Sequence, residues 1–170
     1  AQAAMDSGVA VRPITDMPAY RQKLSQFVYQ SSSSMQPLFA AAKRGPKRVV
    51  YAEGEDERVL RAAQVVVDEG LARPLLLGRP EVISQRIAEF GLRLVPGRDC
   101  EAINLLDPNV YRDAADDYFH LKRREGVSRA VALVGLRRRC ALLAAMVVGG
   151  GRVVDMLCGT LGNYADHLRY

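Results

Sequence analysis

The segment KRVVYAEGEDERVLRAAQVVVDEG, Lys47–Gly70, decides the fold. It opens with Val49–Ala52, a β-branched and aromatic run that is typical of a buried strand, and Gly54 ends this run. Asp56 then stands where it can cap a helix, and acids in a first helical turn suit the positive end of the helix dipole. Apolar residues recur at helical spacing as far as Gly70. A strand, a tight turn and a capped helix form the first half of a βαβ unit.

The acidic cluster around Gly54 allows two interpretations, and the sequence leaves both open. The first is solvation and helix capping, which is the common role of acids at a helix start. The second places the acids at the rim of a binding cleft, because ligands of open α/β sheets bind outside the carboxyl ends of the strands. The acids concerned are Glu53, Glu55, Asp56 and Glu57.

Composition excludes several classes of protein. The chain has 170 residues, of which 49% are hydrophobic, so it is globular and fits one domain or one domain with appendages. Its net charge of +5 suits a phosphate-bearing small ligand as well as a nucleic acid; we expect the small ligand and no nucleic-acid partner. The longest apolar run, Cys140–Val148, is far shorter than the ~20 residues of a membrane-spanning helix, and no secretory leader is evident. We therefore expect a cytoplasmic protein with no membrane contact.

Cysteine and histidine usage gives no sign of a metal site or a disulfide framework. The three cysteines show no CxxC spacing, and His120 and His167 stand apart with no third ligand in view. Cys158 has no base near it in sequence, so a nucleophilic role has little support. We predict no metal site and no catalytic residue in this chain.

The rest of the chain continues the α/β pattern. Residues 1–14 have no periodic pattern and indicate a connecting segment, whereas residues 15–45 indicate a helical arm interrupted by Ser31–Ser34. After Gly70 we expect, in order, a strand at Pro74–Leu77, a helix from Pro80 to Gly91, a strand at Ile103–Leu106, a helix at Val110–Arg124, a helical stretch from Ser128 to Val148 broken near Gly135, and a strand at Val153–Leu157. The order β-α-β-α-β-α-α-β predicts an α/β fold, a parallel sheet with helices on both faces.

Two segments are candidates for ligand binding. Cys158–Tyr164 follows the last predicted strand and holds two glycines, so its backbone N–H groups could bind a phosphate or a carbonyl, although glycine often serves only a turn. Lys122–Gly126 is basic; it is either a favourable helix end with a glycine stop or part of a cleft. Arg137–Arg139 cannot share one helix face, and solvation is its default role.

The chain also resembles known families. Ala52–Ala63, AEGEDERVLRAA, resembles the opening of the phosphate acetyl/butyryltransferase family. Asp155–Arg169, DMLCGTLGNYADHLR, is similar to the family stretch of Asp, a hydrophobic pair, Ser/Cys-Gly, a small polar loop and Asp-x-x-Arg. Ala1–Pro13, AQAAMDSGVAVRP, resembles the end of the catalytic part of bacterial malic enzymes. Together they resemble the hybrid NADP-dependent malic enzymes, in which a phosphotransacetylase-like domain follows the malic domain.

This resemblance implies an organisation in three parts. Residues 1–14 would be the tail of a malic catalytic module, residues 15–45 a helical linker, and residues 46–170 the first, incomplete part of a phosphotransacetylase-like domain. The implied fold is the parallel sheet of the isocitrate/isopropylmalate dehydrogenase type.

The resemblance also implies a function. The domain would sense acetyl-CoA and regulate a malic domain of the same chain, which uses NADP and Mg²⁺ or Mn²⁺, in a homo-oligomer. Arg169 takes the place of the arginine that lines the coenzyme A and phosphate cleft, and the remaining residues of the implied effector site are Gly159, Thr160, Asn163, Lys122 and Arg123. Lys122 stands where the family has an arginine, and this departure counts against acyl transfer because lysine lacks the bidentate fork of arginine.

Two alternatives remain. The segment could belong to a working phosphate acetyltransferase that moves acetyl between coenzyme A and phosphate. It could also serve chiefly as an oligomerisation module, through the arm Asp16–Ala42.

Overall fold

The computed structural model describes residues 2–9, 11–12, 14–28, 32–105 and 107–163. The chain divides into two compact units, residues 1–41 and 42–170. The first unit contains α1 (Gln2–Asp6), α2 (Met17–Val28) and most of α3 (Ser32–Arg44). At the start of α2, the Asp16 carboxylate accepts a hydrogen bond from the Ala19 N–H (2.9 Å), so this helix begins as predicted.

The first unit differs from the prediction in two places. A short helix, α1, occupies a segment that was expected to have no structure of its own. Ser32–Ser34 belong to α3 instead of interrupting the arm. Serine is only moderately unfavourable in a helix, so a helix that Met35–Ala42 sustain can extend back through the serines.

The second unit is built on a parallel sheet of four strands. These are β1 (Lys47–Tyr51), β2 (Ala72–Gly78), β3 (Glu101–Asn104) and β4 (Asp155–Leu157), in the order β3-β2-β1-β4. Val50 of β1 lies opposite Leu75 of β2 and Met156 of β4. The predicted parallel sheet is confirmed, with β3 beginning two residues before the expected Ile103 and with Leu106 outside the described residues.

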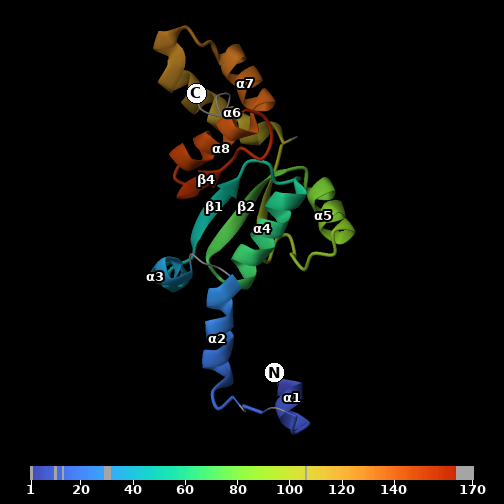
Figure 1. Ribbon diagram of the computed structural model, residues 1–170. Helices are drawn as coiled ribbons and strands as arrows, with labels where there is room; N and C mark the ends of the chain where they lie inside the picture. Colours follow the sequence, from blue (N-terminus) through green and yellow to red (C-terminus); the bar gives the residue numbers. More distant parts are fainter. Residues whose placement is uncertain (1, 10, 13, 29–31, 106, 164–170) are drawn as a thin grey trace. The chain divides into compact units, whose positions relative to one another are not determined.

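The helices of this unit are α4 (Glu57–Asp68), α5 (Pro80–Glu89), α6 (Pro108–Lys122), the 3-10 helix η1 (Arg123–Glu125), α7 (Arg129–Arg138) and α8 (Cys140–Gly149), as Figure 1 shows. Asp56 caps α4 as predicted, accepting from the Arg58 N–H (2.8 Å). The break in the helical stretch after Ser128 falls at Arg139, whose backbone is extended (φ −130°, ψ 97°), and not at Gly135. Gly135 stays helical because a single glycine costs a helix only about 1 kcal/mol.

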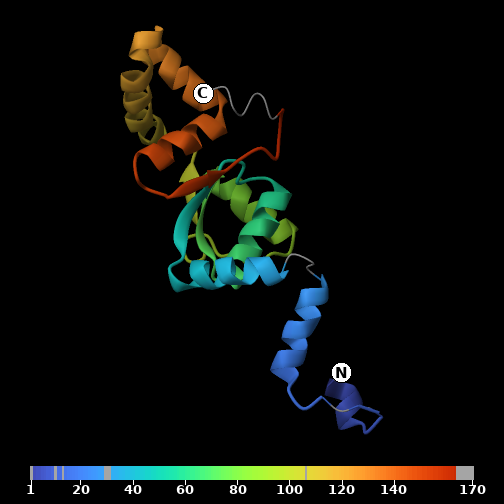
Figure 2. The same ribbon diagram turned by 60° about the vertical axis from the view of Figure 1, so that its left-hand side comes forward.

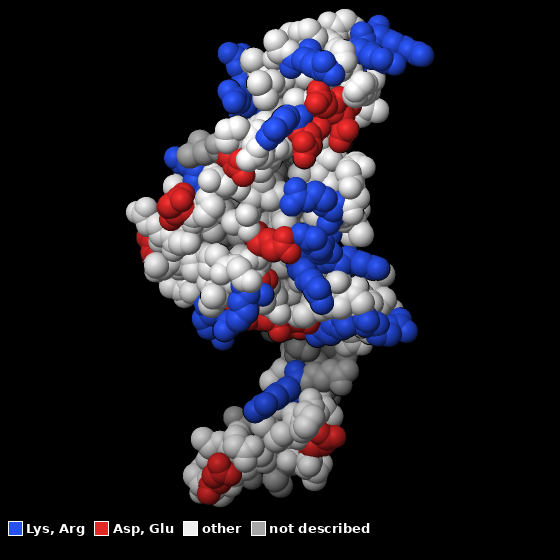
Figure 3. Space-filling view, turned by 180° about the vertical axis from the view of Figure 1, so that it is seen from behind, with Lys and Arg blue, Asp and Glu red and all other residues white. Residues whose placement is uncertain are grey.

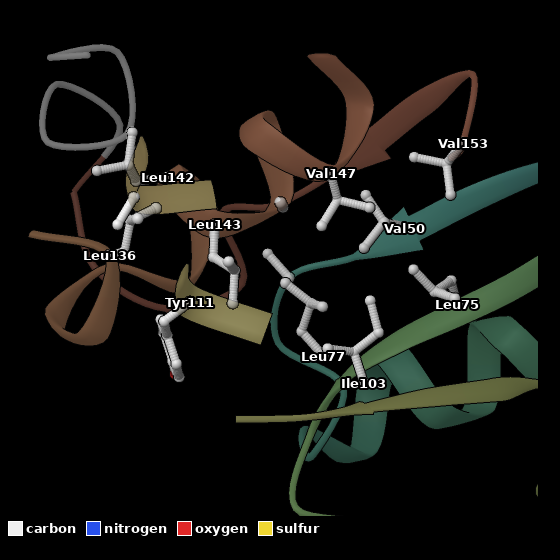
Figure 4. Packing of buried hydrophobic residues seen from close by; sticks show 13 residues of the cluster. Val50, Leu75, Leu77, Ile103, Tyr111, Leu136, Leu142, Leu143, Val147 and Val153 are labelled. Carbon is white, nitrogen blue, oxygen red and sulfur yellow. The ribbon is translucent and has the colours of Figure 1, made fainter. Parts of the chain in front are cut away.

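Helices cover both faces of the sheet, as predicted, and each face has its own core (Figure 2). Tyr51 and Leu76 pack with α4 and α5, whereas Val50 and Leu75 pack with α6, α7 and α8. The alternation follows from the strand period of two, which sends successive side chains to opposite faces. Figure 4 shows the second of these cores, in which Val147 of α8 points toward Val50.

Helix α8 is apolar around most of its circumference, and Ala141–Ala144 and Val147 are buried. A helix that is hydrophobic on all sides needs burial, and contacts with the sheet, α6 and α7 supply it. In the described part of the chain, no helix combines the length and apolarity needed to cross a membrane.

Candidate functional site

The candidate site lies at the carboxyl ends of the parallel strands. The chain adds β2 and β3 on one side of β1 and then returns to place β4 on the other side. The sheet order therefore reverses between β1 and β4, and ligands of open α/β sheets bind at such a reversal. The loops that meet here are Ala52–Asp56 after β1, the turn at Arg79 after β2, and the loop from Cys158 after β4.

A cavity of about 710 Å³ opens at this edge. Its acidic lining comes from the loop after β1, and its basic lining comes from three separate elements: the turn after β2, α5 and α7. The charged residues of the lining are Glu53, Glu55, Asp56, Arg79, Arg86 and Arg137. On the face of the molecule that Figure 3 displays, acidic side chains likewise lie among basic ones.

Glu55 joins the loop after β1 to the turn after β2. Its carboxylate accepts two hydrogen bonds from the Arg79 guanidinium (2.8 and 2.9 Å) and one from the Arg79 backbone N–H (2.8 Å). The bonds from the Arg79 side chain are the main reason that the pKa of Glu55 lies below its usual value. Gly54 adds a backbone bond from its N–H to the Leu77 carbonyl (3.0 Å). The two loops are thus fixed to each other.

Glu53 and Asp56 join the same loop to the loop after β4. The buried Glu53 carboxylate, 9% exposed, accepts from the Gly159 N–H (3.0 Å). Asp56 accepts two bonds from the Arg58 guanidinium (both 3.1 Å), and Arg58 also donates to the Thr160 carbonyl (2.8 Å). Hydrogen bonding to Arg58 is the main cause of the lowered pKa of Asp56. The capping interpretation is confirmed by Asp56, and three of the acids also line a cavity, so the interpretation as the rim of a binding cleft stays a prediction.

Arg86 and Arg137 differ from Arg79 because neither forms an ion pair with an acid of the described residues, although the charge of Arg86 contributes to the lowered pKa of Glu55. Arg86 lies over the Phe90 ring (6.0 Å to its centroid), and Arg137 lies over the Tyr111 ring (5.8 Å). No carboxylate in the described ranges comes within 4.0 Å of either guanidinium. Since the acids of the lining are hydrogen-bonded to other groups, these two cations give the cavity the capacity to bind an anion.

The thiols beside the cavity are poor nucleophiles. Burial, followed by the negative charge of Glu53, raises the pKa of both Cys140 and Cys158. A thiol with a raised pKa carries little thiolate at neutral pH. Within the described segments, no group of three histidine, cysteine or acidic side chains could hold a metal ion.

The predicted site residues do not all come together. Gly159 and Thr160 lie in the loop after β4 beside the cavity, Asn163 is exposed farther along this loop, and Arg169 lies outside the described residues. The Thr160 hydroxyl is buried and has no hydrogen-bond partner among the described residues. Among the described residues, this loop therefore keeps an unsatisfied polar atom.

Lys122 and Arg123 lie at the far end of α6 from the cavity. Lys122 forms an ion pair with Glu125 (3.0 Å), and Arg123 is exposed in η1. Tyr111, which lines the cavity, lies eleven positions before Lys122, and a rise of 1.5 Å per residue makes the axial separation ~16 Å. Neither Lys122 nor Arg123 lines the cavity.

Sequence reasoning missed the three arginines of the lining. Arg79 had a usable signal, because it directly follows Gly78 at the end of a predicted strand. Arg86 and Arg137 had none, since their approach to the cavity depends on how α5 and α7 pack. Arg137 had been assigned to solvent with its two neighbours.

A known protein family and two curated relatives match most or nearly all of this chain. Residues 33–170 match the family described as phosphate acetyl/butaryl transferase. The chain is 48% identical to an NAD-dependent malic enzyme of Rhizobium meliloti (strain 1021), over 99% of the chain and 22% of the relative. It is 42% identical to an NADP-dependent malic enzyme of Escherichia coli (strain K12), over 98% of the chain and 22% of the relative. The chain thus spans about a fifth of the length of these curated relatives.

A solved structure is also similar. The phosphotransacetylase from Streptococcus pyogenes superposes with a TM-score of 0.67 and 25% sequence identity, covering 79% of this chain and 41% of that one. The likeness agrees with the α/β fold found here.

Proposed function

Because the chain belongs to the phosphate acetyl/butaryl transferase family, we propose that it supplies the regulatory, acetyl-CoA-binding domain of a cytoplasmic malic enzyme. The whole enzyme would convert malate to pyruvate and CO₂ while reducing NADP. Its malic domain, outside this chain, would bind NADP and Mg²⁺ or Mn²⁺. Acetyl-CoA binding here would inhibit that domain, within a homo-oligomer.

The observation that carries the proposal is the pair of cavity arginines, Arg86 and Arg137, that have no carboxylate partner in the described segments. Acetyl-CoA is a phosphate-bearing anion, and guanidinium groups suit phosphate because they offer several donors in a fixed fork. The backbone of the Gly159–Thr160 loop and, by family resemblance, Arg169 would add further contacts with the ligand.

Two observations favour regulation over acyl transfer. Malic enzymes match 98–99% of the chain, including the segment before residue 33 where the family match begins. Lys122, which replaces a cleft arginine of the acyltransferases by resemblance, is paired with Glu125 and does not line the cavity.

The proposal is tested by equilibrium binding of acetyl-CoA to the malic enzyme that carries this chain, measured by isothermal titration calorimetry. Arg86→Ala and Arg137→Ala are each expected to weaken binding about 10-fold, because each removes a charge-assisted hydrogen bond to phosphate. The matched control is Arg98→Ala, since Arg98 pairs with Asp99 (2.8 Å) and does not line the cavity. Equal affinity in all four proteins would remove the cavity from the proposal.

The second candidate is a working phosphate acetyltransferase. The family match over residues 33–170 and the likeness to a solved phosphotransacetylase favour it. Formation of acetyl phosphate from acetyl-CoA and phosphate by the same protein would support this candidate against the regulatory one.

A further inference from the structure

The loop after β4, Cys158–Leu161, contributes to two hollows. Leu161 lines the 710 Å³ cavity, whereas Cys158 and Thr160 line a smaller hollow of about 190 Å³. Glu53 lines both. The position of this loop therefore sets the shape of the cavity on one side.

The loop begins at the end of a short edge strand, so it needs support from elsewhere. β4 has three residues and pairs with β1 alone among the described strands. Beyond that strand, the Gly159 N–H is held by Glu53 and the Thr160 carbonyl is held by Arg58. Both contacts reach across the point where the sheet order reverses.

Arg58 supports the loop without lining the larger cavity, whereas Glu53 lines it. Asp56 orients its guanidinium through two hydrogen bonds, and Asp56 is itself fixed as the N-cap of α4. The same guanidinium then donates to Thr160, so the loop is tied to the start of a helix. The side chain of Arg58 is 64% exposed, and its described side-chain hydrogen bonds go to Asp56 and to the Thr160 carbonyl.

We propose that Arg58 is a positioning residue: it holds the Cys158–Leu161 loop as a fixed wall of the cavity, and ligand affinity depends on it without any contact between Arg58 and the ligand. Loss of Arg58 frees the Thr160 carbonyl and removes the tie between this loop and the start of α4. The identity of the ligand as acetyl-CoA rests on the proposed function, whereas the role of Arg58 in fixing the loop does not.

The test combines hydrogen exchange with binding, in the malic enzyme that carries this chain. Arg58→Ala is compared with Arg61→Ala, a matched control in the next turn of α4 whose guanidinium pairs with Glu57 (2.8 Å) and does not reach the loop. Without ligand, Arg58→Ala should raise amide exchange at Gly159, whose N–H is bonded to Glu53, about 10-fold, because the loop opens more often once one charge-assisted hydrogen bond is lost. Exchange within α5 should stay unchanged, which shows that the domain is folded. Acetyl-CoA affinity should fall by a similar factor, and Arg61→Ala should change neither quantity.

Unchanged loop exchange in Arg58→Ala would overturn the proposal. Faster exchange with unchanged acetyl-CoA affinity would overturn the positioning role. If the wild-type protein binds no acetyl-CoA, the proposed function fails, and loop exchange still decides whether Arg58 fixes the loop.

Discussion

Gly54 packs closely against β2 and also lines the cavity, so both the fold and the site require a residue without a side chain at this position. A Cβ at this position would lie 2.8 Å from the Leu77 carbonyl oxygen and 2.9 Å from the Leu76 Cβ. Both neighbours belong to β2, so neither can move without disturbing the sheet. Glycine is required here for close approach of two backbones and not for an unusual backbone angle.

Gly54→Ala is therefore expected to destabilise the domain by about 2 kcal/mol, the typical cost of forcing an extra methyl into a packed site. The measurement is the midpoint of urea unfolding. Gly45→Ala is the control, because nothing lies within 4 Å of a Cβ built at Gly45. Equal midpoints for the two variants would contradict the described approach of the loop to β2.

The charge of Glu53 should be measurable through Cys158. Burial and then Glu53 raise the pKa of this thiol, so Glu53→Gln should lower its pKa. The readout is the pH dependence of alkylation at Cys158, whose midpoint should move to lower pH in the variant. Cys100, whose pKa burial raises to about 11 with a contribution from Asp99, is the internal control. A midpoint that does not move would contradict the influence of the Glu53 charge on the pKa of Cys158.

At the residue scale, the sequence predicts contacts between neighbours in the chain better than contacts between residues far apart in the chain. The capping role of Asp56 follows from its place before a periodic apolar run. The bond between Glu53 and Gly159 joins residues that are 106 positions apart, and nothing local indicates it. Arg137 looked solvated for the same reason: which side of α7 meets the cavity depends on tertiary packing.

At the scale of elements, the ion pair between Glu55 and Arg79 joins the loops after β1 and β2. The hydrogen bonds from Arg79 hold the pKa of Glu55 in the folded protein below its ordinary value of about 4.5. Its contribution to stability is therefore complete above about pH 4.5 and is lost as the pH falls through the folded value.

Glu55→Gln should thus be less stable than wild type at pH 7, by about 1 kcal/mol or less because Arg79 is half exposed. The difference should shrink as the pH falls below 4.5. Urea unfolding at a series of pH values measures both effects, with the exposed Glu89→Gln as the control. A difference that does not vary with pH would mean that the carboxylate charge of Glu55 is not what stabilises the loops.

The order of strands and helices was predictable because each element carries its own signal. A β-branched and aromatic run indicated β1, a short apolar run ended by Gly78 indicated β2, and glycine or proline marked most of the boundaries. The break between α7 and α8 was misplaced, since glycine is tolerated inside a helix and the extended backbone of Arg139 has no local signature. The extension of α3 through Ser32–Ser34 was missed because serine only weakly opposes a helix.

At the scale of the whole molecule, membership of the family accounts for the fold, and the similarity to malic enzymes supports the proposed regulatory role. The second unit presents a cavity with two arginines that lack carboxylate partners among the described residues, and the acids around them are hydrogen-bonded. A domain that binds a ligand regulates an enzyme only if the two states of the enzyme differ in affinity for that ligand.

The most direct test of the regulatory claim is malate-dependent reduction of NADP by the whole enzyme, titrated with acetyl-CoA. The titration is repeated on a shortened protein that ends at Ser34 and so lacks the second unit. We predict inhibition of the whole enzyme and none of the shortened protein. Inhibition that persists in the shortened protein, or no response in the whole enzyme, would contradict the assignment of the acetyl-CoA site to this domain.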